Sequence, residues 1–387
     1  MSRRSLAAEL VILSLLTAGS SCSRPAEDGS RHTSSSSTVR PREARLETMS
    51  DIKTDEKVVF YSTYAWQAGD NPGWTVAIHG SIFEPEPGSL KRAAAIESLR
   101  AALGLSRSQT ESDIFRQRAR AFLVDNERGK RIAVRLGDKV YDAGTSEPNG
   151  HFSALLRFSA AEADDLRRNA DRQGWLEFRA VTRRDDSRTF AGRVQWLVPE
   201  GVSVISDIDD TIKISNVQDR QDLLANTFLR AFRPVPGAAP LYCTWADAGA
   251  ALHYVSASPW QLYEPLADFC RQEGFPAGTF HMKLVRLHDS SAANLIGSQE
   301  AYKTEIIEKI LADFPRRRFA LVGDSGENDP EIYAAVTRKH PTRIQHVFIR
   351  NVGGRGSLPD RFQKAFEGIP AAQWQIFTQP SELPEQL

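Results

Sequence analysis

The chain has 387 residues, of which 41% are apolar and 25% are charged, and these values are ordinary for a globular protein. A chain of this length is expected to form about two domains besides its terminal segments. Because 49 basic residues balance 49 acidic ones, the overall charge gives no reason to expect a nucleic acid partner.

The first 21 residues have the features of an export signal. Arg3 and Arg4 precede a short apolar run over residues 10–16, and small residues then lead to Cys22. The apolar run is shorter than the roughly 20 residues that span a bilayer. Small residues directly before a cysteine resemble a bacterial lipoprotein signal, which implies lipidation of Cys22. We therefore expect an exported protein of the bacterial cell envelope, lipid-anchored on the periplasmic side. The alternative is an N-terminus that stays uncleaved.

Residues 22–55 are rich in Ser, Thr, Arg and Glu. This composition is typical of a flexible linker, which would hold a folded part away from a membrane surface. Two cysteines follow later in the chain, Cys243 and Cys270, which could pair in an oxidising compartment; we expect both to be unpaired, partly buried thiols.

Residues 56–200 are expected to form a β-rich domain. Segments in which apolar and polar residues alternate, with turn-forming residues between them, predict strands at 57–62, 73–80, 131–136, 151–158, 175–181 and 192–198. A helical pattern covers about residues 90–123. We expect a small β-sandwich with a helical insertion, packed before the next domain.

Residues 201–387 show a different pattern, in which short apolar strands alternate with helices. Strands are expected at 202–207, 253–257, 279–285, 318–323 and 344–349. The helices include one after Pro259 and one over residues 299–313, which has an apolar stripe and is stopped by Pro315. This alternation predicts an α/β domain with a Rossmann-like parallel sheet, helices on both faces, and ligands at the carboxyl ends of the strands.

Two carboxylates, Asp207 and Asp209, leave the first of these strands. Like charges at this spacing repel and raise each other's pKa, so the pair indicates a bound cation or a catalytic role. Asp207 can attack phosphorus and form an aspartyl-phosphate. Asp209 can protonate the leaving oxygen and later activate water. A solvated surface loop is the alternative, and the apolar strand before the pair and Thr211 after it argue against that alternative.

Two further side chains in this part of the chain suit a phosphate. Ser256 ends the next strand, where its hydroxyl can bind a phosphoryl oxygen. Pro259 favours Ser258 as the cap of the following helix, which leaves Ser256 for the ligand. Lys303 lies one turn inside its helix, where an ammonium can neutralise both the nucleophile and the phosphoryl group. Lys213 is a second basic residue that could contact the phosphate, and it is a weaker candidate than Lys303.

The last motif is a strand followed by a tight loop with two carboxylates, Asp324 and Asp329. Mg²⁺ prefers octahedral oxygen ligands, including a few carboxylates. We expect Asp207, Asp324 and the main-chain carbonyl of Asp209 to bind Mg²⁺, with Asp329 as a further ligand or a close neighbour of the ligands. Asp329 before Pro330 is also a good helix N-cap, and the sequence leaves both roles open.

These motifs, in this order, resemble the haloacid-dehalogenase-like phosphohydrolase superfamily. The segments SDIDDTIK, YVSASPWQL and GDSGENDPEIY are most similar to the actin-patch phosphatidate phosphatase family and its bacterial relatives. The resemblance covers about residues 201–352 and implies Mg²⁺-dependent conversion of phosphatidate to diacylglycerol. The roles that it implies are nucleophile for Asp207, acid and base for Asp209, phosphate contacts for Ser256 and Lys303, and metal ligands for Asp324 and Asp329.

The connections between the predicted strands are too short for a lid domain. An open site favours a bulky or membrane-borne phosphomonoester over a small metabolite. We therefore expect a phosphatidate phosphatase; the alternatives are a phosphatase for soluble phosphomonoesters and a non-catalytic envelope lipoprotein whose β-rich domain binds a partner. A binding module would have no use for Asp207, Asp209, Lys303 and Asp324 together.

Overall fold

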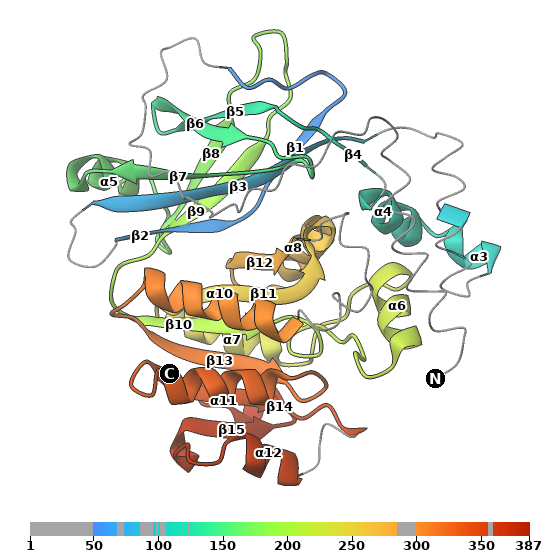
Figure 1. The fold of residues 1–387 in the computed structure, drawn as a ribbon, viewed down its shortest axis with the longest axis vertical. Helices are drawn as coiled ribbons and strands as arrows, with labels where there is room; N and C mark the ends of the chain where they lie inside the picture. The colour runs from blue at the N-terminus through green and yellow to red at the C-terminus, as the bar shows by residue number, and fades with distance from the viewer. Residues whose placement is uncertain are drawn as a thin grey trace, which may run out of the picture.

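The computed structural model describes residues 49–67, 73–85, 96, 97, 100, 106–122, 124–284, 299–354 and 359–387. Two sheets dominate these residues, a mixed sheet of nine strands and a parallel sheet of six (Figure 1). The predicted signal over residues 1–21, Cys22 and most of the predicted linker lie outside the described residues. In the part of the chain that is described, no helix has the length and apolarity needed to cross a membrane.

The mixed sheet contains the strands that the alternating segments predict, and three more. Its strands are β1 (Lys57–Phe60), β2 (Thr63–Gln67), β3 (Trp74–Glu84), β4 (Asp125–Asn126), β5 (Arg131–Leu136), β6 (Lys139–Thr145), β7 (His151–Phe158), β8 (Trp175–Ala180) and β9 (Ala191–Trp196). The order is β1-β3-β2-β9-β8-β5-β6, and β4 and β7 also pair with β3. The β2–β9 pair is parallel and the others are antiparallel.

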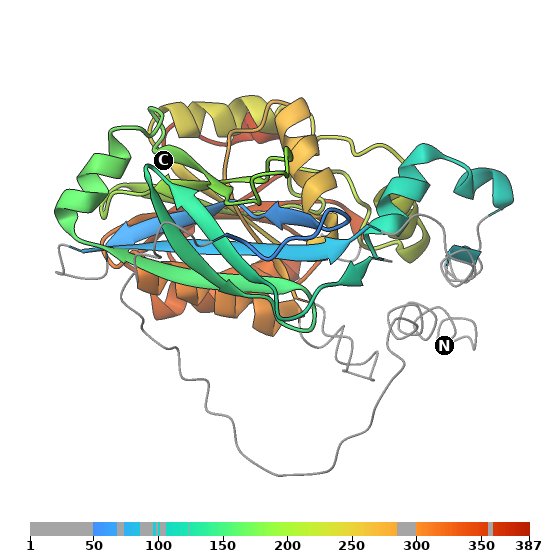
Figure 2. The same ribbon diagram turned by 90° about the horizontal axis from the view of Figure 1, so that it is seen from above.

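This sheet curls around one apolar core instead of forming the expected two-sheet sandwich (Figure 2). The eleven-residue strand β3 pairs with β7 over most of its length, and with β1 and β2 over the two halves of its other edge. The end strand β6 then lies beside β7. Alternation along a strand predicts which side chains face the core, but it does not predict which edges pair.

The end of the predicted linker is packed onto the mixed sheet, so the expected linker boundary at residue 55 is too late. The N–H group of Ser50 donates to the carbonyl of Val181 at 2.8 Å. Ile52 is buried in the core of this sheet. Glu56 is buried as well, and its carboxylate contacts the ammonium of Lys130 at 2.7 Å. These contacts hold residues 50–56 in place.

Helices of the mixed-sheet part include α3 (Arg107–Thr110), α4 (Asp113–Ala121) and α5 (Ala160–Arg167). The first two fall in the expected helical stretch, and the rest of that stretch lies mostly outside the described residues. Ser112 caps α4, since its hydroxyl accepts the N–H of Phe115 at 3.2 Å. Figure 1 shows α4 leaving the mixed sheet and lying against α6 (Arg220–Phe228), which belongs to the parallel-sheet part.

The parallel sheet confirms the predicted α/β pattern. Its strands are β10 (Val202–Asp207), β11 (Ala251–Pro259), β12 (Thr279–Lys283), β13 (Arg318–Asp324), β14 (Ile344–Arg350) and β15 (Trp374–Phe377). Their spatial order, β12-β11-β10-β13-β14-β15, is that of doubly wound α/β folds, with every neighbouring pair parallel. The sequence pattern missed β15, a four-residue edge strand after the short helix α12 (Pro359–Ala365).

Helices cover both faces of this sheet. One face carries α7 (Ala238–Asp247) and α8 (Tyr263–Gln272), and the other carries α10 (Gln299–Asp313) and α11 (Asp329–Lys339). Neighbouring residues of β10 point to opposite faces, so Val204 joins the first core and Ile205 joins the second.

The two sheets are joined by aromatic packing. The ring of Tyr61, just after β1, stacks on Trp260 with centroids 4.0 Å apart. The N–H of Ser62 donates to the hydroxyl of Tyr263 at 3.0 Å. Tyr64 of β2 packs edge-on against Phe314, just after α10. The mixed sheet therefore contributes residues to both cores of the parallel sheet.

Candidate active site

The predicted site lies where the strand order of the parallel sheet reverses. From β10 the chain moves to β11 and β12 on one side, and it then crosses to β13 on the other side. In doubly wound α/β folds, ligands bind at such a switch point, outside the carboxyl ends of the strands. Asp207 ends β10 and Asp324 ends β13. The fold therefore places both carboxylates at this switch point.

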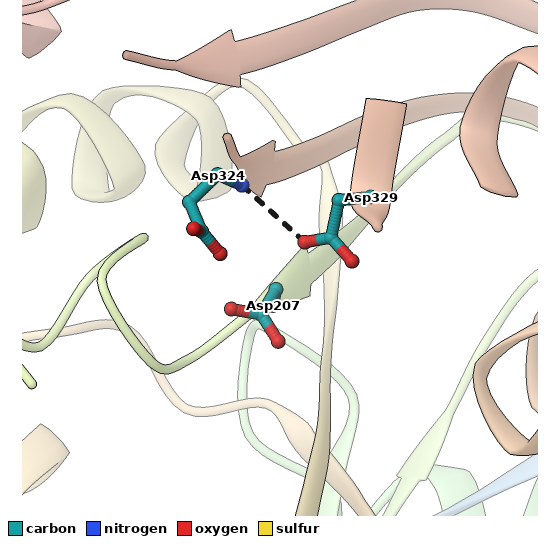
Figure 3. A group of neighbouring side chains, drawn as sticks. All are labelled: Asp207, Asp324 and Asp329. Carbon is teal, nitrogen blue, oxygen red and sulfur yellow. Dashed lines mark hydrogen bonds between the residues drawn. The ribbon is translucent and has the colours of Figure 1, made fainter. Parts of the chain in front are cut away.

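Three carboxylates meet at this point, those of Asp207, Asp324 and Asp329 (Figure 3). One oxygen from each lies within 4.8 Å of the others, and all three side chains are buried. Asp324 Oδ1 accepts the N–H of Gly326 at 2.5 Å, whereas Asp324 Oδ2 has no hydrogen-bond partner among the described residues. A buried oxygen without a partner is costly, and oxygen-rich clusters suit a hard divalent cation. The donor set therefore fits such a cation.

Burial and mutual repulsion act on this cluster. Burial raises the pKa of Asp324 well above its usual value, and the carboxylates of Asp329 and Glu327 raise it further, with Lys303 opposing them. Burial likewise raises the pKa of Asp207, and Lys303 again opposes the shift. The buried carboxylates therefore repel one another, and Lys303 offsets part of that repulsion.

Lys303 of α10 is the cation of the cluster, and its side chain is 2% exposed. Its Nζ lies 2.8 Å from Asp207, 2.6 Å from Asp329 and 2.9 Å from Glu327. Burial lowers the pKa of Lys303, but the three carboxylates prevail and hold it well above its usual value. Glu327 is a site residue that the sequence motifs do not single out, although it lies between the predicted ligands Asp324 and Asp329.

The nucleophile candidate is held at both oxygens. Asp207 Oδ1 contacts Lys303, and Asp207 Oδ2 accepts the hydroxyl of Thr211 at 3.1 Å. Thr211 is buried in the turn after β10. These contacts fix the orientation of the Asp207 carboxylate.

Asp209 lies apart from this cluster, with its own set of partners. Its Oδ1 lies 2.7 Å from Lys213 Nζ and accepts the hydroxyl of Ser215 at 2.7 Å. Its Oδ2 accepts the hydroxyls of Ser256 and Ser258, each at 3.3 Å. Burial raises the pKa of Asp209, but Lys213 and Ser215 outweigh burial and the pKa is lowered. Lys213 is thus engaged with Asp209 and is not free for a phosphate.

The expected helix cap at Ser258 is wrong. Strand β11 continues to Pro259, a short 3-10 turn follows, and no side chain caps α8. Ser258 instead faces the site, and its N–H donates to the hydroxyl of Ser256 at 3.0 Å. Both serines therefore border Asp209. The X–Pro step keeps Ser258 extended, which favours the strand over a helix start.

The N-cap role of Asp329 is also wrong. Asn328 precedes α11 and Asp329 is its first helical residue. The Asp329 carboxylate turns into the site, where it accepts the N–H of Asp324 at 3.3 Å (Figure 3) and contacts Lys303. Gly323 makes this possible, because a Cβ there would collide with the Asp329 carboxylate and lie 2.7 Å from the ring of Tyr333.

Asp210 is a second site residue that the sequence pattern does not single out. It has a φ of 55°, which is rare outside glycine. Its carboxylate accepts three successive N–H groups, of Ser215, Asn216 and Val217, at 2.7–2.9 Å. Arg350 donates to its carbonyl at 2.7 Å. Asp210 therefore fixes the loop that follows Asp207. The feature of the sequence that could have identified Asp210 is its place as the third aspartate of the same motif.

Residues 202–351 match the sequence profile of a family described as the catalytic domain of the phosphatidate phosphatase APP1. The chain is 34% identical over 168 residues to phosphatidate phosphatase APP1 of Saccharomyces cerevisiae, which covers 42% of this chain and 28% of the yeast protein. It is 30% identical over 168 residues to an uncharacterized protein of Schizosaccharomyces pombe, which covers 43% of this chain and 27% of that protein. This chain therefore spans less than a third of either relative.

Among solved structures, one on a carbohydrate esterase covers 83% of this chain and 87% of its own, at 11% identity. Its TM-score of 0.19 is too low to bear on the fold. The sequence similarities are more informative, because the matched segment contains every predicted site residue of the parallel sheet. The comparisons therefore show that residues 202–351 are similar to the catalytic domain of the phosphatidate phosphatase family.

Proposed function

We propose that the protein is a Mg²⁺-dependent phosphomonoester hydrolase that acts through an aspartyl-phosphate, with phosphatidate as its main substrate. The observation that carries the proposal is the buried Asp207 at a strand end, in contact with Lys303 and beside Asp324 and Asp329. This arrangement lies within the segment that matches the phosphatidate phosphatase catalytic domain.

The charges of the site require a cation before a phosphate can approach. Lys303 is a single ammonium among the carboxylates of Asp207, Asp324, Asp329 and Glu327. A phosphate anion entering this field would be repelled. Asp207, Asp324 and the Asp209 carbonyl would hold Mg²⁺, with Asp329 as a further ligand. Bound Mg²⁺ would neutralise charge on the carboxylates and on the phosphoryl oxygens.

In the first step, a carboxylate oxygen of Asp207 attacks phosphorus. The new bond to Asp207 forms as the bond between phosphorus and the ester oxygen breaks. Asp209 gives its proton to the departing oxygen, which leaves as the alcohol, diacylglycerol in the case of phosphatidate. Lys303 stabilises the negative charge that is spread over the transferring group.

In the second step, water attacks phosphorus and the bond to Asp207 breaks. Asp209, now a carboxylate, takes a proton from the water. Inorganic phosphate leaves and Asp207 is restored. Lys213 and the hydroxyl of Ser215 stabilise the ionised Asp209 that this step requires. A bound phosphate anion raises the pKa of Asp209 again, as the acid role in the first step requires.

Phosphatidate is the proposed substrate because the matched family and the yeast relative carry that activity in their names. The N-terminal signal extends the proposal to the cell envelope, with Cys22 as the lipidated residue that brings the enzyme to its substrate. Cys22 lies outside the described residues, so a direct test is needed. Radiolabelled palmitate should enter the wild-type protein and not Cys22→Ser.

The main test measures phosphate release from vesicles that contain phosphatidate, with the purified full-length chain in Mg²⁺ or EDTA. We expect Mg²⁺-dependent release that Asp207→Asn abolishes and that Asp185→Asn, an exposed control, leaves intact. Release that persists in Asp207→Asn would overturn the mechanism. Hydrolysis of aryl phosphate alone would favour the soluble-ester alternative. No hydrolysis of either ester would favour the binding-protein alternative.

A further inference from the structure

We propose that helix α4, which the mixed sheet contributes, positions the catalytic acid Asp209, and that Arg118 is the positioning residue. The inference rests on the proposed function, because it assigns a role in the same reaction. It assigns part of the catalytic apparatus to a segment outside residues 202–351, the segment matched to the phosphatase family.

Helix α4 is docked on α6 by apolar contacts. Phe115 and Ala119 of α4 are fully buried and share a small core with Phe228 of α6. The ring of Phe122, just after α4, lies 5.5 Å from that of Phe228. The buried residues of this core belong to none of the three larger cores, and Phe122 packs both against this core and against the core that contains α7 and α8.

Arg118 of α4 caps the end of α6. Its side chain is 6% exposed, and its Nη1 donates to the carbonyls of Asn226, Thr227 and Arg230 at 3.2, 2.6 and 2.9 Å. The last turn of α6 has no basic residue of its own. The carbonyl end of a helix is partly negative and favours a cation. Arg118 supplies this cation from a distant part of the sequence.

Two series of contacts connect Arg118 to the same oxygen of Asp209. In the first, the guanidinium lies 3.7 Å from the ring centroid of Phe232, and Lys213 Nζ lies 4.8 Å from that centroid. Lys213 in turn contacts Asp209 Oδ1 at 2.7 Å. The ring thus fixes the ammonium that orients the acid.

The second series of contacts runs through backbone carbonyl groups. Arg118 binds the carbonyl of Asn226, whose side-chain amide donates to the carbonyl of Ser215 at 2.8 Å. The hydroxyl of Ser215 donates to Asp209 Oδ1 at 2.7 Å. Both series of contacts hold Oδ1, and Oδ2 is the oxygen that faces Ser256 and Ser258. Loss of Arg118 therefore shifts the acid while the nucleophile keeps its own contacts.

A displaced acid has a selective effect on the reaction. An alkyl ester such as phosphatidate expels a basic alkoxide, which needs a proton as it leaves. A nitrophenyl ester expels a stable anion, which leaves without one. General acid catalysis contributes about 100-fold to 10,000-fold where it is needed, and a displacement of about 1 Å costs up to about 100-fold. A purely structural defect would instead lower both rates equally.

The experiment compares Arg118→Ala with the wild-type full-length chain on short-chain phosphatidate and on 4-nitrophenyl phosphate. We expect kcat/KM on the alkyl ester to fall about 10-fold to 100-fold and kcat/KM on the aryl ester to fall less than about 3-fold, because kcat/KM reports the step in which the alcohol leaves and not the later hydrolysis that both esters share. Arg116→Ala is the matched control, because Arg116 lies on the exposed side of α4 and contacts Asp113. Both of its rates should match wild type.

Phe232→Leu is a second variant that leaves the apolar contact between α4 and α6 in place, and it should show the same selective loss on the alkyl ester. If Arg118→Ala does not fold, Phe232→Leu provides the test in its place. Equal losses on both esters in the folded variants, or no loss, would overturn the inference while the proposed function stands. A wild-type protein that hydrolyses neither ester would overturn both.

Discussion

Replacement of Asp324 by Asn should stabilise the metal-free protein while abolishing its activity. Asp324 is fully buried, and carboxylate oxygens of Asp207 and Asp329 lie within 4.8 Å of one of its own. A like-charge pair at 4.8 Å costs about 3 kcal/mol at an effective dielectric constant of about 20. The raised pKa values of the cluster mean that protonation already relieves part of this repulsion. We therefore expect a net gain of about 1–3 kcal/mol in EDTA.

Urea denaturation in EDTA and in Mg²⁺ measures both effects. In Mg²⁺ at about 100-fold its Kd, the free energy of unfolding of the wild type should rise by about 2.7 kcal/mol. That of Asp324→Asn should rise by less than about 1 kcal/mol. Asp185→Asn, an exposed substitution of the same chemistry, should follow wild type in both buffers. An Asp324→Asn protein that is no more stable than wild type in EDTA would refute the repulsion argument. Equal stabilisation of both by Mg²⁺ would refute the ligand assignment.

Two further predictions concern close packing and pH. Gly323→Ala should lower phosphatase activity more than about 10-fold and destabilise the protein by about 1–3 kcal/mol, because the new Cβ displaces the carboxylate of Asp329; activity with normal kinetics would contradict this. Burial lowers the pKa of His253 well below its usual value, and lowers that of His79 and of His281 to about 3. Below about pH 6.5 the unfolded chain binds protons that the folded chain does not, so stability should fall by up to about 1.4 kcal/mol per pH unit for each histidine. Urea denaturation of wild type and His79→Gln between pH 7 and 5 tests this, because the difference between the two cancels the opposing contribution of the raised Asp207 and Asp324 pKa values; a difference that does not change with pH would be inconsistent with a neutral buried His79.

Local periodicity accounts for the elements that were predicted well. The strand over 131–136, the strand over 151–158 and the helix over 299–313 have their predicted bounds. In each, the spacing of apolar residues reflects a single repeating backbone geometry. The order of the motifs on successive strands also allowed Asp207 and Asp324 to be placed at one edge of a parallel sheet, because the carboxyl ends of parallel strands share an edge.

Alternatives that depend on a distant partner were not decided by local pattern. Asp329 before Pro330 has the sequence of a helix cap, yet its carboxylate faces Lys303, which is 26 residues earlier in the chain. Ser258 also has the sequence of a helix cap, yet its hydroxyl donates to the carboxylate of Asp209, which is 49 residues earlier in the chain. In both cases a charged group in the folded protein offers a stronger hydrogen bond than the helix end does.

The sequence by itself determined the α/β pattern, the strand ends that carry the aspartates, and the ordered set of residues suited to phosphoryl transfer. Tertiary structure alone decided that the mixed sheet curls around one core, that Glu327 shares Lys303, and that Arg118 reaches α6. The physical reason is the range of the interactions. Propensity and periodicity act over a few residues, whereas strand pairing, charge compensation and helix docking join residues separated by many positions in the chain.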